Sequence, residues 1–288
     1  MSSRVLPDFE LLMPKDLGEG LQLLSRHGSD VAIMAGGTDV LVMMKANYRS
    51  PYVMSLAGIG GLDHLDWAPE TGLRVGALTT VDQIEQSGAV KQHYRALWQA
   101  ATLFATPQIR NSATVIGNLL RASPAGDCSC AVLALGGTVV LESVDGRREV
   151  AIDDFWLDYN LTARRPDEIA VELRLPPPGK GTGSAFRRLT RTHEDLAKLN
   201  ASARLDVDGK ICRTARLAMG CVGPTTQRLP KCEAILVGKA IDEALLKTLD
   251  DVIQSEIAPI DDKRSTAEYR RAVAGVLLRR TISQALAD

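Results

Sequence analysis

The chain has 288 residues, of which 34 are basic and 35 acidic, so its net charge is −1. This balance, without a dense block of lysine and arginine, argues against a nucleic-acid partner. No apolar run approaches the ~20 residues of a membrane span, and the N-terminus lacks the apolar core of a signal peptide, so we expect a cytoplasmic protein.

The first predicted unit, residues 1–57, is a small α/β lobe. Asp16, followed by a glutamate three residues later, has the form of a helix start, and leucines at helical spacing predict a helix over 16–27. Short apolar runs predict strands over 31–34 and 52–56.

The second predicted unit covers residues 58–176. Thr80 begins a capping box and a short helix, and a longer helix is expected over 90–104. Strands are expected over 64–67, 73–77, 139–143, 148–152 and 168–175.

The third predicted unit, residues 177–288, follows a linker rich in proline and glycine at 176–183. Antiparallel strands are expected over 184–190, 201–207 and 211–220. Apolar residues at helical spacing predict helices in the remainder, so the overall fold class is α+β.

The five cysteines form an odd set without the spacing of a metal site, and we expect reduced thiols that are partly buried. The four histidines are scattered, and the chain has no G-x-S-x-G motif, so neither a metal centre nor a hydrolytic triad is indicated.

Two glycine-rich segments, far apart in the sequence, are the most informative feature of the chain. The first is Ala35-Gly36-Gly37-Thr38-Asp39, and the second runs from Ser112 to Asn118 and continues to Asp127. Glycine lacks the Cβ that would keep an anion from the backbone amides. Taken alone, the Gly36-Gly37 pair is more typical of an ordinary turn. Together, the segments suit a dinucleotide, although neither is a Rossmann or P-loop motif.

These segments, with 73–80, 186–191 and 220–228 in the same order, resemble the FAD-binding subunit of molybdenum hydroxylases. These are the medium subunits of the carbon monoxide dehydrogenase and xanthine dehydrogenase type. The resemblance covers nearly the whole chain. It implies a two-lobed FAD-binding fold of the vanillyl-alcohol-oxidase/PCMH type, followed by a C-terminal domain with an antiparallel sheet and helices.

The resemblance also implies the residues that contact FAD. It assigns the diphosphate to the backbone amides of 35–39, a ribose or ribitol hydroxyl to Asp127, and the flavin edge to Arg188. The full set is Ala35, Gly36, Gly37, Thr38, Asp39, Ser112, Thr114, Gly117, Asn118, Ser123, Asp127 and Arg188.

Two of these assignments have competing interpretations, and one residue nearby departs from the family pattern. Asp39 is equally suited to capping the next turn, and Arg188 to a surface salt bridge. Ile116 stands where the family usually has glycine, so the second segment either takes an ordinary backbone conformation there or shifts against the flavin.

The implied function is an electron-transfer subunit of a molybdenum-containing dehydrogenase. FAD is expected to be non-covalent, because Thr38 stands where covalent relatives place a histidine. The implied partners are a [2Fe–2S] small subunit and a molybdopterin large subunit, in a dimer of heterotrimers, with NAD or a redox carrier as acceptor. Two alternatives are a self-sufficient FAD oxidoreductase of the same fold and a scaffold subunit without cofactor.

Overall fold

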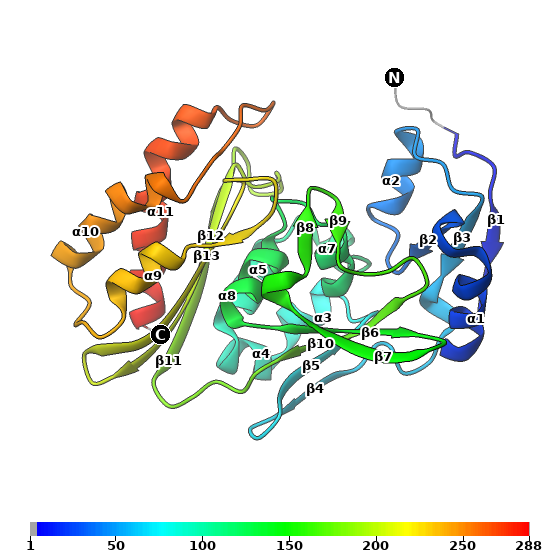
Figure 1. The fold of residues 1–288 in the computed structure, drawn as a ribbon, viewed down its shortest axis with the longest axis horizontal. Coiled ribbons are helices and arrows are strands. Elements are labelled where there is room, and N and C mark those ends of the chain that lie inside the picture. Colours follow the sequence, from blue (N-terminus) through cyan, green and yellow to red (C-terminus); the bar gives the residue numbers. More distant parts are fainter. Residues whose placement is uncertain (1–4, 288) are drawn as a thin grey trace.

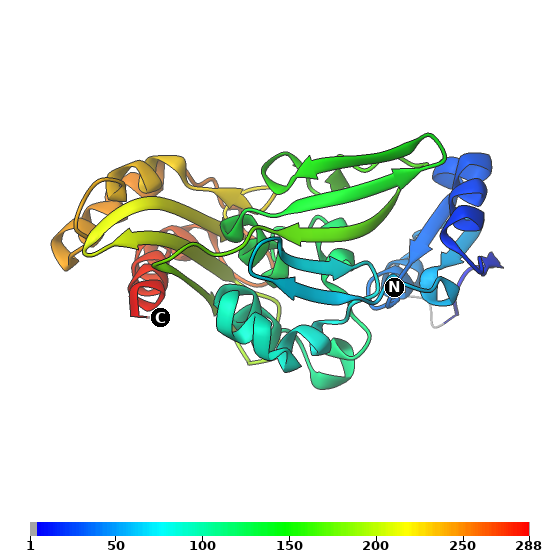
Figure 2. The same cartoon turned by 90° about the horizontal axis from the view of Figure 1, so that it is seen from below.

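The computed structural model describes residues 5–287 and arranges three main sheets in a row, with helices between and outside them (Figure 1). The N-terminal sheet and the C-terminal helices lie at opposite ends of the long axis, as the view from below shows (Figure 2). The mixture of helices and sheets agrees with the predicted α+β class. No helix within 5–287 is long and apolar enough to cross a membrane.

The N-terminal sheet is parallel and has the strand order β1-β3-β2. Its strands are β1 Glu10–Leu12, β2 Val31–Met34 and β3 Tyr52–Ser55. The expected first helix is confirmed as α1 Leu17–His27, in which the Asp16 side chain accepts a hydrogen bond from the Glu19 amide at 2.9 Å. A second helix, α2 Val40–Lys45, follows the first glycine segment and was not expected from the sequence.

The central sheet is antiparallel, with the order β4-β5-β10-β6-β7, and carries the expected strand pairs. Its strands are β4 Leu65–Ala68, β5 Gly72–Gly76, β6 Thr138–Ser143, β7 Gly146–Ala151 and β10 Ile169–Leu175, with β8 Trp156–Asp158 and β9 Leu161–Thr162 forming a small hairpin beside it. The helices of this region are α3 Val81–Gln86, α4 Gly88–His93, α5 Arg95–Leu103, α6 Pro107–Arg110, α7 Val115–Leu120 and α8 Asp127–Leu135.

Single 3-10 turns occur along the described chain. They are η1 Gly28–Asp30, η2 Leu56–Gly58, η3 Ile152–Asp154 and η4 Ile253–Ser255.

The single helix expected over 90–104 is wrong, because the chain breaks at Tyr94 into α4 and α5. Tyr94 has φ −133° and ψ 55°, outside the helical region. Its side chain is buried, and its hydroxyl donates to the carbonyl of Pro176 at 3.2 Å. Because that partner is remote in the sequence, the helical spacing of apolar residues could not reveal the break.

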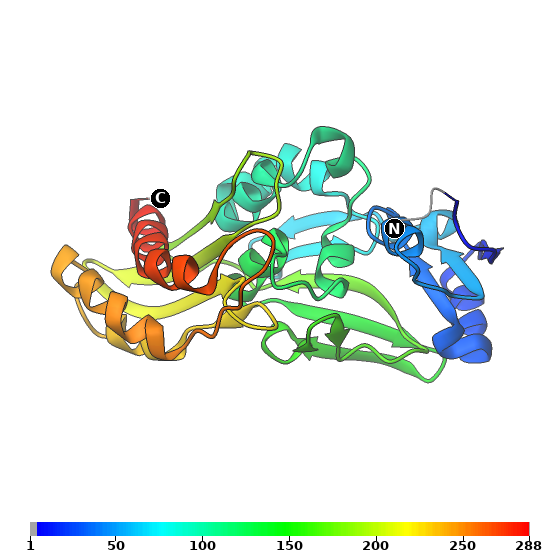
Figure 3. The ribbon, with the colours of Figure 1, turned by 90° about the horizontal axis from the view of Figure 1, so that it is seen from above.

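The C-terminal sheet is antiparallel, with the order β11-β12-β13-β14. Its elements are β11 Thr182–Leu189, β12 Leu199–Asp208, β13 Ile211–Gly220, β14 Gln227–Arg228, α9 Pro230–Leu236, α10 Glu243–Val252 and α11 Ala267–Ala287. These helices gather at the outer end of the molecule (Figure 3).

The two faces of β12 join different parts of the molecule, because side chains alternate along a strand. Leu199, Ala201 and Ala203 pack in the core formed with the C-terminal helices. Asn200 faces the other way and reaches α8, which lies between the central and C-terminal sheets with all of its residues buried. The N-terminal and central sheets share a separate apolar core. Helix α8, together with α5, which packs on β11, therefore fixes the central and C-terminal regions to each other.

Candidate functional site

A hollow of about 350 Å³ lies between the N-terminal sheet and α7. This volume falls within the range of small-molecule sites. The lining includes most of the predicted site residues: Ala35, Gly36, Gly37, Thr38, Asp39, Thr114, Gly117 and Asn118. The structure therefore brings the two glycine segments to one place, although they are far apart in the sequence.

Gly36 allows the two segments to meet. A Cβ at Gly36 would lie 1.7 Å from the carbonyl oxygen of Ser112, which is impossible without moving the backbone. Gly37 has φ 73°, a conformation that favours glycine and turns the chain out of β2. The two glycines thus have different tasks: Gly36 permits close approach, and Gly37 permits the turn.

The first segment presents four unused backbone donors to the hollow. Within residues 5–287, the amides of Gly36, Gly37, Thr38 and Asp39 donate to no protein acceptor, although Gly36, Gly37 and Thr38 are half-buried. Half-buried backbone amides without a partner are uncommon in folded proteins. Successive amides in such a turn form a concave site for an anion.

The second segment forms the helix α7, so the amide of Gly117, one of the residues expected to contact FAD, is engaged within the protein. Thr114 precedes α7, and its side-chain oxygen accepts from the Gly117 amide at 3.0 Å. Ile116 takes an ordinary helical conformation and is buried, which is the first of the two expected alternatives. What this segment offers the hollow is side chains, those of Thr114 and Asn118, more than backbone donors.

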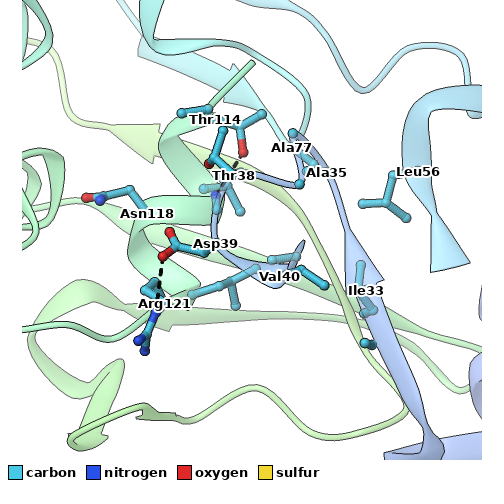
Figure 4. Close-up of a pocket in the computed structure, with 18 of the residues that line it drawn as sticks. Ile33, Ala35, Thr38, Asp39, Val40, Leu56, Ala77, Thr114, Asn118 and Arg121 are labelled. Carbon is cyan, nitrogen blue, oxygen red and sulfur yellow. Dashed lines mark hydrogen bonds and ion pairs between the residues drawn. The ribbon is translucent and has the colours of Figure 1, made fainter. Parts of the chain in front are cut away.

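Asp39 stands at the N-terminus of α2, but its side chain makes no capping hydrogen bond. Instead, its Oδ1 lies 3.4 Å from Nε of Arg121. Figure 4 shows this contact reaching from the first glycine segment to the end of α7. The capping interpretation of Asp39 is therefore not what the structure shows, and its carboxylate joins the two walls of the hollow.

Asn118 connects the hollow to α8. Its Oδ1 accepts from both the amide and the hydroxyl of Ser129, each at 3.2 Å. Since Ser129 lies in the first turns of α8, Asn118 fixes α7 relative to the start of that helix.

Asp127 and Arg188 form a buried ion pair outside the lining of the hollow. Their side chains are 6% and 4% exposed, and Nη1 of Arg188 lies 2.6 Å from Oδ2 of Asp127. The other carboxylate oxygen accepts from Nδ2 of Asn200 at 2.9 Å. Burial raises the pKa of Asp127, while Arg188 and Asn200 act in the opposite direction. The structure thus shows neither an open ribose acceptor nor a surface salt bridge, because both oxygens have protein partners away from solvent.

The two remaining predicted residues also lie outside the lining. Ser112 contributes its backbone carbonyl to the contact with Gly36. The hydroxyl of Ser123 accepts from the Ala125 amide at 3.3 Å within the turn before α8.

Polar residues that were not expected from the sequence also line the hollow, among them Arg121, Asn160 and Arg164. Arg121 follows Asn118 by three positions, a spacing that places both on one side of a helix. It would have been found had the second segment been recognised as helical. Arg164 donates to the carbonyls of Arg165 and Glu168, each at 2.8 Å, and burial lowers its pKa. Asn160 comes from the β8–β9 turn, and no local signal indicated it.

The sequence matches two known protein families, which together cover most of the chain. Residues 7–178 match the family described as "FAD binding domain in molybdopterin dehydrogenase", and residues 184–285 match the "CO dehydrogenase flavoprotein C-terminal domain". The carbon monoxide dehydrogenase medium chain of Hydrogenophaga pseudoflava is 32% identical over 98% of both chains. The nicotinate dehydrogenase FAD-subunit of Eubacterium barkeri is 31% identical over 94% of both.

A solved structure resembles the chain equally closely. In carbon monoxide dehydrogenase from Hydrogenophaga pseudoflava, one chain superposes with a TM-score of 0.95 and 32% identity, covering 98% of this chain and 99% of that one.

Proposed function

The chain belongs to the family of FAD-binding subunits of molybdopterin dehydrogenases, and we propose that it passes electrons from an iron–sulfur subunit to an external acceptor. Family membership confirms the predicted resemblance, the predicted fold class and FAD as the cofactor. It also identifies the chain as an oxidoreductase subunit.

The observation that carries this proposal is the cradle of unused amides at residues 36–39, facing the hollow. A dinucleotide such as FAD has a diphosphate that needs donors at such a place. The charged side chains in the lining are Asp39, Arg121 and Arg164, so their sum is positive and suits an anion. The residues present therefore fit FAD.

We propose that the amides of 35–39 hold the diphosphate and that Thr38, Thr114, Gly117 and Asn118 contact the rest of the cofactor. For Ser112, Ser123, Asp127 and Arg188, contact with FAD rests on the resemblance alone. The Asp127–Arg188 pair holds the start of α8 against the C-terminal sheet, and Asn118 holds α7 against α8. When bound, the flavin supplies conversion between single-electron and two-electron transfer.

We also propose the assembly and its organisation. The partners are a [2Fe–2S] small subunit and a molybdopterin large subunit, in a cytoplasmic dimer of heterotrimers that uses NAD or a redox carrier as acceptor. Residues 1–57, 58–176 and 177–288 are the structural units of this chain.

The cysteines of this chain support placing the metal centres in the partners. All five are free and buried. Burial raises the pKa of Cys221 to about 12 and also raises the pKa values of Cys128 and Cys130. Within residues 5–287, no three His, Cys, Asp or Glu side chains gather in an arrangement that could hold a metal ion.

The test is to compare the FAD-loaded chain alone with the complex purified from its native host. We expect the chain alone to turn over no organic substrate, because its hollow offers anion donors but no catalytic acid, base or nucleophile in a recognisable arrangement. The complex should contain a [2Fe–2S] chain and a molybdopterin chain, identified by mass and metal content, and should transfer electrons to an acceptor. Robust substrate turnover by the isolated chain would instead favour the self-sufficient oxidoreductase.

A further inference from the structure

Arg121 is the residue of the hollow at which three segments of the chain meet. It directly follows the last residue of α7 and lines the hollow. Its side chain contacts Asp39 of the first glycine segment and Asn160 of the β8–β9 turn. Its side chain is 23% exposed, so it is partly withdrawn from water but still open to the hollow.

The guanidinium has donors left after these contacts. Nε lies against Asp39, and Nη1 donates to the side-chain oxygen of Asn160. Within residues 5–287, no acceptor is engaged by Nη2, which carries two N–H groups. A planar guanidinium with spare donors matches the oxygens of a phosphate group better than any other side chain.

The surroundings hold this side chain in place before any ligand arrives. The Asn160 amide donates to the carbonyl of Ala122 at 3.1 Å, which ties the β8–β9 turn to the residue that follows Arg121. Asn160 has φ 58°, a left-handed conformation that asparagine tolerates. Its side-chain oxygen is therefore presented to Arg121 by a fixed turn.

Asp39 would repel a diphosphate if it were left alone. It is the sole carboxylate among the described residues that line the hollow, and its side chain is 55% exposed. The contact with Arg121, at 3.4 Å, places a positive charge beside this carboxylate and offsets its repulsion of an anion at the neighbouring amides.

We propose that Arg121 is a phosphate ligand of this hollow, positioned by Asp39 and Asn160, and that Asp39 acts as its counter-ion. The proposal rests on the proposed FAD site and adds to it a charged side chain from the second wall. Arg121 would add a charged side-chain donor from the end of α7 to the backbone donors of 36–39, which line the same hollow.

The test is the dissociation constant of FAD, measured by fluorescence titration of the full-length apoprotein. Arg121→Ala should raise it about 10- to 100-fold, the usual worth of a charge-assisted hydrogen bond. Arg121→Lys, which keeps the charge but loses the planar fork, should fall between. Added salt should weaken FAD binding less in Arg121→Ala than in the wild type, because one charge–charge attraction is gone.

Making Arg121→Ala in a protein that already carries Asp39→Asn separates direct contact between Arg121 and phosphate from an effect of Arg121 through Asp39. If Arg121 contacts phosphate, Arg121→Ala should cause a similar loss when added to Asp39→Asn. A loss that disappears in Asp39→Asn, or an unchanged dissociation constant in Arg121→Ala, would overturn the proposal.

The matched control is Arg213→Ala, which removes an exposed Arg–Asp pair in the β12–β13 hairpin and should leave FAD binding within about two-fold of wild type. Circular dichroism establishes that each variant is folded, and Arg121→Gln replaces Arg121→Ala if the latter is not. Failure of the wild-type chain to bind FAD would contradict the proposed function itself, which distinguishes that outcome from failure at Arg121.

Discussion

Replacing Gly36 by alanine is expected to reduce FAD affinity at least about ten-fold and to destabilise the apoprotein by about 1–3 kcal/mol. The added Cβ would lie 1.7 Å from the Ser112 carbonyl oxygen and 2.5 Å from its carbon. Because both contacts are with backbone, a side-chain rotation cannot relieve them, and the two glycine segments must separate. Equilibrium unfolding without cofactor and fluorescence titration with FAD measure the two effects separately.

Gly60→Ala is the control for this change. Gly60 is exposed in a turn of the same region, its φ is not in the left-handed range, and a Cβ there would meet nothing within 4 Å. It should leave both measurements near wild type. Wild-type affinity and stability in Gly36→Ala would show that the close contact between the segments does not shape the site.

Asp127→Asn is expected to lower the free energy of unfolding by about 3–5 kcal/mol, because it leaves the buried guanidinium of Arg188 without a counter-charge. Arg188→Met should cost a similar amount by leaving the carboxylate alone. The double variant should lose less than either single change, since no uncompensated charge remains. Chemical denaturation of the four proteins gives the coupling between the two residues.

The exposed pair of Arg213 and Asp208 provides the comparison. Its side chains are 60% and 72% exposed, so Asp208→Asn should cost less than about 1 kcal/mol. If Asp127→Asn were as mild, or if the single costs simply added in the double variant, the pair would not be what holds α8 against the C-terminal sheet.

Local signals in the sequence were sufficient for much of the fold. The Asp16 cap and the Thr80 capping box lie within a few residues of the helices they start, and both were recognised. Alternation and turn residues likewise located most strands of the central and C-terminal sheets. The break at Tyr94 was missed because the buried hydroxyl of this residue has its partner, the Pro176 carbonyl, on a distant part of the chain.

The same distinction applies to the site. The glycines were found because their chemistry is local. Asp127 and Arg188, in contrast, lie 61 residues apart in the sequence and become neighbours only through the packing of α8 on the C-terminal sheet. Arg121 was missed because no helix was predicted over the second segment, and only a helix brings residues at this spacing to the same side as Asn118.

The central claim is that this chain carries FAD, and the most direct measurement is the flavin content of the purified chain. We expect one FAD per chain, identified by its absorbance and released intact by acid, because Thr38 offers no covalent attachment and the cradle binds through hydrogen bonds. A colourless chain that takes up no FAD, FMN in place of FAD, or flavin retained on the denatured polypeptide would contradict the account.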